Sequence, residues 1–477
     1  MNRLKALDAA FLYAETTRMP MHIGSVQIIE VPSNRNATFF SELKQFVRSR
    51  SHLLPYMTHR VVHAPLRIDH PRWGACEPDY DAHIERIAVA APGDMAQLER
   101  CVAALHARPL DRERPLWKIY YIDELSGGRA AYFNVVHHAC LDGLAGQTAV
   151  ETLTDAAPDA DDPRPASADS VATLRSRSAF ELIADAARRF DALARLGNRL
   201  LAPGGSMLGA LAPNTPINRA IGAARSYAML RISMPDVKAI GKSHGCSIND
   251  VFLTVCGGAL RAYLLRRDAL PQASLIAGVP VSVRQPGDRT MNTQVTMTRV
   301  SLATQIDDPI ARLVAVHASS DTAKATAQDI NALIPADLRV PGAPWIGRAA
   351  SSAWELSGAA SYLPPLVNLV ISNVPGPRSI RYSNGARVST HFPVSIPAHG
   401  AAVNITVQSY AEHFDIGITA CARTVPDVAL LRDDLLRAYI DLRTRVLNRR
   451  VDVRSLQPNV RETRIERRCM PRDLKVA

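Results

Sequence analysis

Two adjacent histidines, His137 and His138, are followed by Asp142 and then Gly143. They end residues 130–138, whose aromatic and β-branched side chains predict a buried strand, and they precede a helix predicted from about residue 142 to 153. Neighbouring strand residues point to opposite faces, so only one of the two imidazoles can easily face a given cavity. A neutral imidazole can take the proton of an alcohol at pH 7 and so make it a nucleophile. We therefore predict that His138 is a general base, with His137 in a supporting role.

Each residue of this pattern also has a structural explanation. A histidine pair at a strand end is, in an arbitrary protein, more often structural than catalytic. Asp142 suits the N-cap of the predicted helix, and Gly143 can relieve crowding at its start. The combination of two histidines, a carboxylate and a glycine at a strand-to-helix transition favours the catalytic interpretation.

The elements around this pattern alternate between strands and helices. Residues 23–31 predict a strand, and apolar residues at helical spacing predict helices over 39–50 and 95–107. This organisation predicts an α/β domain over residues 1–155.

The next segment differs in composition. Residues 155–168 are acidic, contain prolines and have almost no large apolar side chains, which is typical of a flexible linker. Residues 178–201 predict an amphipathic helix that either packs on the second domain or lies on an anionic lipid surface. We assign residues 156–226 to this linker and helix.

A second α/β domain is predicted over residues 227–445. Its clearest elements are a helix over 247–265, strands over 277–283 and 293–302, and a hairpin built from 403–410 and 414–421. Residues 446–477 are basic and lack periodicity, so we predict a disordered tail.

Composition limits the functional classes. The chain has 477 residues, which is long enough for two cores, and a net charge of +11, which suits anionic partners such as a lipid surface or the phosphates of coenzyme A. Aromatic residues are only 5% and do not alternate with basic ones, so nucleic acid is the least favoured partner. Seven scattered cysteines without C-x-x-C spacing indicate a reducing compartment and no zinc site. With no signal peptide and no apolar run of about 18 residues, we expect a cytoplasmic protein, peripheral at most to the inner membrane or to lipid inclusions.

Several further motifs occur in a fixed order along the chain. The first half contains LDAAFL from Leu7, Glu15-Thr16, PMHIG from Pro20, and PLDR from Pro109 followed by RPLW from Arg114. The second half contains INDV from Ile248, VPVSVR from Val279, SNVPGP from Ser372 and NITV from Asn404. Trp117 of RPLW suits a core anchor, and Pro375-Gly376 suits a type II turn.

With its HHxxxDG pattern, this ordered set resembles the bacterial wax ester synthase/acyl-CoA:diacylglycerol acyltransferase family. That family lies within the superfamily of chloramphenicol acetyltransferase and peptide-synthetase condensation domains. The resemblance spans roughly residues 4 to 445. Met291-Asn292 stands where family members often have Gly-Asn, and the tail and linker have no counterpart that we recognise.

The resemblance implies two domains of the chloramphenicol-acetyltransferase type with a tunnel between them. Long-chain acyl-CoA would enter from one side and diacylglycerol or a fatty alcohol from the other. His138 would deprotonate the hydroxyl for direct attack on the thioester, without a covalent intermediate, metal or prosthetic group. Asp142 would form a structural ion pair with Arg60 or Arg284, and its loss would reduce soluble protein. Asn249 and Asp250 would lie near the tunnel and contact substrate.

Two other functions remain open from the sequence. One is a superfamily relative that acylates a polyketide or peptidyl alcohol from a carrier-bound donor. The other is a catalytically inactive lipid-binding protein of the lipid-droplet surface.

Overall fold

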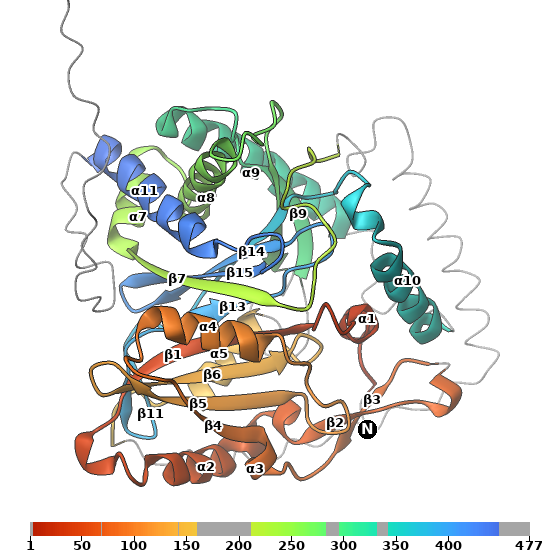
Figure 1. Ribbon diagram of the computed structural model, residues 1–477, viewed down its shortest axis with the longest axis vertical. Helices are drawn as coiled ribbons and strands as arrows, with labels where there is room; N and C mark the ends of the chain where they lie inside the picture. The colour runs from red at the N-terminus through yellow and green to blue at the C-terminus, as the bar shows by residue number, and fades with distance from the viewer. Residues whose placement is uncertain are drawn as a thin grey trace, which may run out of the picture.

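The chain forms two large mixed sheets, each with helices, in a computed structural model (Figure 1). The structure describes residues 3–67, 69–141, 143–159, 211–282, 295–331 and 342–447. Because both sheets combine parallel and antiparallel pairs with covering helices, the α/β prediction is confirmed.

The first sheet has seven strands, in the order β11-β12-β1-β6-β5-β4, with β13 also paired to β1. Only the β4–β5 pair is parallel among these described pairs; the others are antiparallel. Its strands from the first half of the chain are β1 (His22–Glu30), β4 (Ile84–Ala88), β5 (Trp117–Leu125) and β6 (Arg129–His137). A small separate sheet pairs β2 (His59–Val62) with β3 (Arg72–Ala75).

Helices cover both faces of the first sheet, because its central strands are apolar on both sides. On one face, α2 packs with Phe39, Leu43 and Val47 against Tyr121. On the other face, α4 packs Leu98 and Val102 with Tyr120 and Phe133. The helices of this half are α1 (Ala6–Ala14), α2 (Phe39–Arg50), α3 (Tyr80–His83), α4 (Met95–His106) and α5 (Gly143–Thr152). Short 3-10 turns are η1 (Ser33–Arg35), η2 (Ser51–Leu53), η3 (Pro55–Met57) and η4 (Pro65–Arg67).

The second sheet has six strands in the order β7-β15-β14-β10-β8-β9. They are β7 (Arg225–Ser233), β8 (Ile276–Ser282), β9 (Val295–Ser301), β10 (Leu369–Val374), β14 (Val403–Tyr410) and β15 (His413–Cys421). Helices α7 (Met234–Ser243), α8 (Ile248–Leu265), α9 (Pro309–Asn331) and α11 (Val428–Leu447) lie on one side of it in Figure 1. Helix α10 (Ala343–Ser357), followed by η5 (Ala359–Ser361), lies beside α1 instead.

The apolar composition of helix α8 is explained by its burial in the core. It is long and apolar enough to cross a membrane, with a mean hydropathy of 1.3, but 67% of it is buried inside the protein. Its buried face belongs to the core of the second half, which includes Val251, Leu253 and Leu260.

Three short strands connect the two halves. β11 (Arg381–Ser383), β12 (Ala386–Val388) and β13 (Phe392–Val394) come from the second half of the chain but join the first sheet. Ile29 of β1 pairs with Val388, and Val26 pairs with Phe392. The domain boundaries at residues 155, 226 and 445 stay a prediction, and residues 381–394 belong to the first sheet by pairing.

A second connection between the halves is polar. The backbone N–H of Met229, on β7, donates to Oε1 of Glu99 on α4 at 2.7 Å. Nη1 of Arg432 lies 3.5 Å from the same oxygen. Burial raises the pKa of Glu99 to about 7, although Arg432 opposes this shift.

Candidate active site

The pairing of β1 with β6 positions the two histidines. His137 pairs with His22, and the backbone N–H of His138 donates to the carbonyl of Met21 at 2.8 Å. The chain then turns, with the N–H of Cys140 donating to the carbonyl of His137 at 2.9 Å. The predicted strand end is therefore confirmed, and His138 is the first residue beyond the strand.

The last residue of the PMHIG segment, Gly24, must be a glycine because of its close contact with β6. A Cβ atom at residue 24 would lie 2.3 Å from the carbonyl oxygen of Asn134 on β6. Only glycine lets the two backbones approach this closely.

The imidazole of His137 is buried and both of its nitrogens are engaged. The backbone N–H of Ala139 donates to Nδ1 at 3.0 Å, so Nδ1 carries no proton. Nε2 therefore carries the proton, and it lies 3.5 Å from Oε1 of Glu15. This arrangement fixes the ring and leaves neither nitrogen to accept a proton from a substrate.

Glu15 is the acid of a buried ionic network. Its Oε2 accepts hydrogen bonds from Nε of Arg112 at 2.8 Å and from Nη2 at 2.5 Å, and its Oε1 accepts one from the backbone N–H of Met21 at 3.1 Å. Burial alone would raise the pKa of Glu15, but His137 and Arg112 lower it to about 2. Glu15 is therefore ionised at neutral pH.

Arg112 also holds helix α1 in place. Its Nη2 donates to the carbonyl of Leu12 at 2.8 Å, in the last turn of α1. The neighbouring Phe11 stacks on the ring of His138, with ring centroids 4.1 Å apart and planes within 8°. The network thus fixes His137 directly and fixes the aromatic surface on which His138 lies.

A second pair of buried histidines, His22 and His106, lies beside His137 in the fold. Nε2 of His22 donates to the carbonyl of His106 at 2.8 Å, and Nε2 of His106 donates to the carbonyl of His22 at 3.1 Å. Burial lowers the pKa of His22 to about 4 and that of His106 well below its ordinary value. Both rings are neutral, and they join β1 to the end of α4.

His138 differs from these three histidines because its side chain is only half-buried. Gly143 begins α5. Asp142 and Arg284 lie outside the described residues, so the predicted ion pair of Asp142 stays a prediction. Arg60, the other predicted partner, has its Nη1 3.8 Å from Oε2 of Glu113 at the surface.

Asp250 has a structural role at the start of α8. Ser247 and Asp250 form a capping box, in which each side chain accepts the backbone N–H of the other. Oδ2 of the buried Asp250 also lies 2.9 Å from Nδ1 of His317 on α9. The half-buried Asn249 makes no side-chain hydrogen bond among the described residues, which leaves it available to a ligand.

Two other motif residues serve the fold. Trp117 is 2% exposed, and its Nε1 donates to the carbonyl of Met57 at 3.0 Å, so the core-anchor prediction is confirmed. The predicted type II turn at Pro375-Gly376 is wrong, because φ of Gly376 is not positive. Glycine is needed there because a Cβ atom would lie 2.1 Å from the carbonyl oxygen of Ser409.

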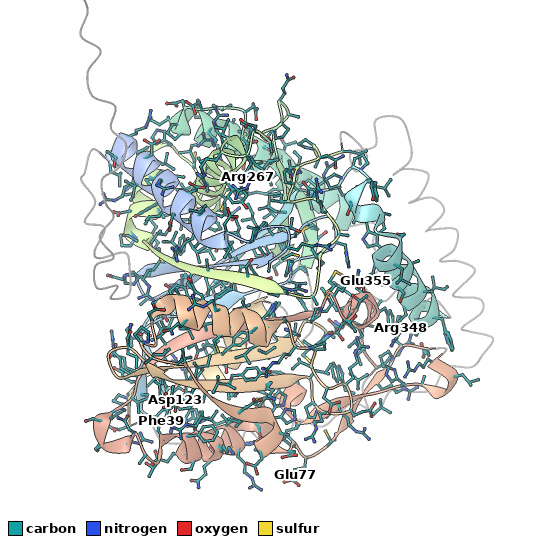
Figure 2. The ribbon with its side chains drawn as sticks, in the orientation of Figure 1. Phe39, Glu77, Asp123, Arg267, Arg348 and Glu355 are labelled. Atoms are coloured by element: carbon teal, nitrogen blue, oxygen red, sulfur yellow. The ribbon has the colours of Figure 1, made fainter. Side chains whose placement is uncertain are left out.

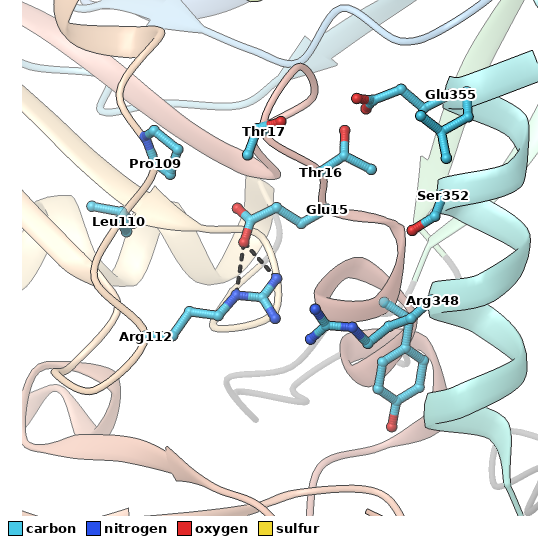
Figure 3. A pocket seen from close by; sticks show the side chains of 11 residues that line it. Glu15, Thr16, Thr17, Pro109, Leu110, Arg112, Arg348, Ser352 and Glu355 are labelled. Atoms are coloured by element: carbon cyan, nitrogen blue, oxygen red, sulfur yellow. Dashed lines mark hydrogen bonds and ion pairs between the residues drawn. The ribbon is translucent and has the colours of Figure 1, made fainter. Parts of the chain in front are cut away.

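A cavity of about 470 Å³ opens on the other side of Glu15 (Figure 3). Its walls come from residues 13–17, residues 109–112 and α10, which contributes Arg348, Ser352, Glu355 and Leu356. Figure 3 shows Arg348 reaching across from α10 toward the Glu15–Arg112 pair. The described residues that line this cavity include neither His137 nor His138.

Sequence reasoning missed the roles of Glu15, Arg112 and Phe11. All three lie in the motifs that carry the resemblance, but spacing gave no reason to connect them. Glu15 and Arg112 are far apart in the chain and meet only because α1 packs against the segment before β5. In the part of the chain that the structure describes, no group of three His, Cys, Asp or Glu side chains could hold a metal ion.

The structure combines two mixed sheets with a histidine pair at the end of a central strand. Residues 4–252 match the wax ester synthase/diacylglycerol acyltransferase catalytic domain, and residues 292–443 match the C-terminal domain of the same family. The chain belongs to this family and is an acyltransferase.

Named relatives and solved structures agree with this assignment. A Mycobacterium tuberculosis protein named as a diacylglycerol O-acyltransferase is 34% identical over 443 residues, covering 89% of this chain and 96% of the relative. A second from the same organism is 30% identical, covering 93% and 99%. The solved wax ester synthase/diacylglycerol acyltransferase of Marinobacter aquaeolei is 26% identical, with a TM-score of 0.69, covering 93% of this chain and 100% of that one.

A more distant structure shares the fold. The first condensation domain of the calcium-dependent antibiotic synthetase is 14% identical, with a TM-score of 0.59, covering 96% of this chain and 98% of that domain. The predicted fold of the chloramphenicol-acetyltransferase type is thereby confirmed.

Proposed function

We propose that this acyltransferase moves a long-chain acyl group from acyl-CoA to diacylglycerol, a long-chain fatty alcohol, or both. The names of its relatives support diacylglycerol as acceptor, and the family match includes wax ester synthases. The basic net charge of +11 suits a donor that carries phosphates.

His138 is the general base in this proposal. The observation that carries it is the difference between the two adjacent rings: both nitrogens of His137 are engaged inside the fold, whereas His138 is half-buried on the face of Phe11. A base must reach the substrate proton, which favours His138 over the enclosed ring of His137.

The reaction proceeds without a covalent enzyme intermediate. His138 takes the proton of the acceptor hydroxyl, and the oxygen attacks the thioester carbonyl. The new C–O bond forms, the C–S bond breaks, and the imidazolium returns the proton to the thiolate of coenzyme A. No cofactor is required, and a placed base contributes roughly 10²–10⁴ in rate.

Lipid product analysis tests the function. One acyl-CoA is offered to the purified protein with a mixture of diacylglycerol and hexadecanol, and free thiol is measured in parallel. We expect triacylglycerol, wax ester or both, in amounts that match the released thiol. Thiol release without either ester, or ester formation only from a carrier-bound donor, would contradict the proposal.

A further inference from the structure

The cavity beside Glu15 has one cationic side chain without an acidic partner among the described residues. Glu15 is neutralised by Arg112. Glu355 lies 3.6 Å from Nε of Arg18 and 3.6 Å from Nε2 of His399. Arg348, on the wall formed by α10, takes part in no ion pair or hydrogen bond in the described part of the chain. Figure 2 shows it on the side of α10 that faces α1.

A second arginine, Arg67, belongs to η4, which contacts the helix that forms one wall of this cavity. Nε1 of Trp345, one turn before Arg348 on α10, donates to the carbonyl of Leu66 at 3.0 Å. This bond ties η4, which contains Arg67, to α10, which carries Arg348. The guanidinium of Arg67 also has no hydrogen bond or ion pair with any described residue.

The backbone of η4 is strained at this point. Leu66 and Arg67 have φ values of 53° and 52°, in the left-handed region that side chains other than glycine disfavour. Strain of this kind is concentrated at ligand sites, where it positions a group for binding.

The charges of these arginines also lower the pKa of His63. After burial, the charges of Arg67, Arg112 and Arg348 are the main causes that lower the pKa of His63. These three arginines come from three separate segments of the chain. Glu113 opposes them only weakly.

We infer that this cavity binds the phosphate groups of the acyl donor, with Arg67 and Arg348 as the anion-binding residues and Arg112 in the wall. The inference rests on the proposed function, because it takes acyl-CoA as the donor. Guanidinium groups bind phosphate through paired, charge-assisted hydrogen bonds. Glu15 lines the cavity and also contacts His137, so the cavity adjoins the network that fixes His137, and the pantetheine arm of the donor would extend from here toward His138.

Donor analogues test this inference. The KM of wild type, Arg348→Gln and Arg67→Gln/Arg348→Gln is measured with an acyl-CoA and with the same acyl group on pantetheine, which lacks the phosphates. We expect the KM for acyl-CoA to rise about tenfold for the single variant and roughly a hundredfold for the double variant, relative to the KM for acyl-pantetheine. Arg48→Gln, which removes an exposed arginine on α2, is the matched control.

Direct binding separates this inference from the proposed function. Calorimetric titration with coenzyme A itself should show about tenfold weaker binding to Arg348→Gln, whether or not ester is formed. If wild type transfers acyl groups but the variants bind coenzyme A as it does, the inference is wrong and the function stands. Loss of binding to anionic phospholipid vesicles with unchanged coenzyme A binding would assign the arginines to a membrane surface and also overturn it.

Discussion

The backbone N–H of Ala139 donates to Nδ1 of His137 at 3.0 Å, two residues after the ring it fixes. The same ring presents its Nε2 proton to Glu15. The first of two neighbouring histidines is thus part of the scaffold, and the second is the candidate base. This division of roles leads to predictions that separate catalysis from stability.

Replacing His138 should abolish catalysis without unfolding the protein. We expect His138→Ala to lower kcat by about 10²–10⁴, with little change in the thermal midpoint because the side chain is half-buried. His137→Ala should instead lower stability by roughly 1–3 kcal/mol, because it leaves the buried N–H of Ala139 without a partner and removes one contact of the Glu15 carboxylate. Measurements of turnover and of thermal unfolding for both variants separate the catalytic effect from the effect on stability. Near-wild-type turnover of His138→Ala would exclude the mechanism.

Glu15 should make stability fall in acid. Its pKa is about 2 in the folded protein, against an ordinary value of 4.5, so its contribution is complete above pH 4.5 and is lost as pH falls from 4.5 toward 2. The contribution is on the order of 3 kcal/mol. Glu15→Gln should be less stable at pH 7 and should lose this part of the pH dependence, as measured by urea unfolding. Glu42→Gln, which breaks a surface pair with Arg35, should barely change stability. Equal pH profiles for wild type and Glu15→Gln would disprove the role of the network.

Glu99 should act in the opposite direction. Its pKa is raised to about 7 in the folded protein, so the folded state binds more protons than the unfolded state between pH 4.5 and 7. Stability from this group therefore decreases as pH rises through that window. Glu99→Gln keeps an acceptor for the N–H of Met229 and removes the charge. We expect it to gain up to about 3 kcal/mol at pH 8 and nothing at pH 4.5. A variant that is less stable at pH 8 would mean that the ionised carboxylate is required there.

Asp250 and His317 should be coupled. Removing the capping side chain in Asp250→Ala should cost about 1–2 kcal/mol, and a double-mutant cycle with His317→Ala should show a coupling of about 0.5–3 kcal/mol. Chemical denaturation of the four proteins measures it. Additive effects would mean that the 2.9 Å contact contributes nothing.

Asn249 should behave differently from its neighbour. Because its side chain makes no hydrogen bond among the described residues, Asn249→Ala should leave stability unchanged. If it contacts substrate as predicted, the KM for acceptor or donor rises. Unchanged kinetics together with unchanged stability would remove Asn249 from the site.

The sequence predicted those helices and strands whose buried apolar residues recur at regular spacing. The helix over residues 39–50 agrees with α2, because Phe39, Leu43 and Val47 share one face, and the hairpin over 403–421 agrees with β14 and β15. Strands β11 to β13 were not predictable in this way. Each has three residues, and β12 and β13 form by pairing with β1, more than 350 residues earlier in the chain, while β11 pairs with β12.

The site shows the same division. The histidine pair stands out in the sequence, whereas Glu15 and Arg112 acquire their roles only through contacts between distant segments. For Asp250, by contrast, the sequence does contain a pattern that predicts its structural role. Ser247 and Asp250 have the spacing of a capping box, which explains the aspartate without a substrate. The contact with His317 could not be predicted, since it requires α8 and α9 to pack together.

Because β12 and β13 join the first sheet, that sheet can be completed only after residues 386–394 have been synthesised. While the ribosome is still translating residues before 381, strand β1 has β6 on one side and an open edge on the other. An open strand edge on a nascent chain invites pairing with other chains. A gene fragment that ends before β11 should therefore yield aggregates, and the nascent protein should depend on chaperones until about its last fifth emerges.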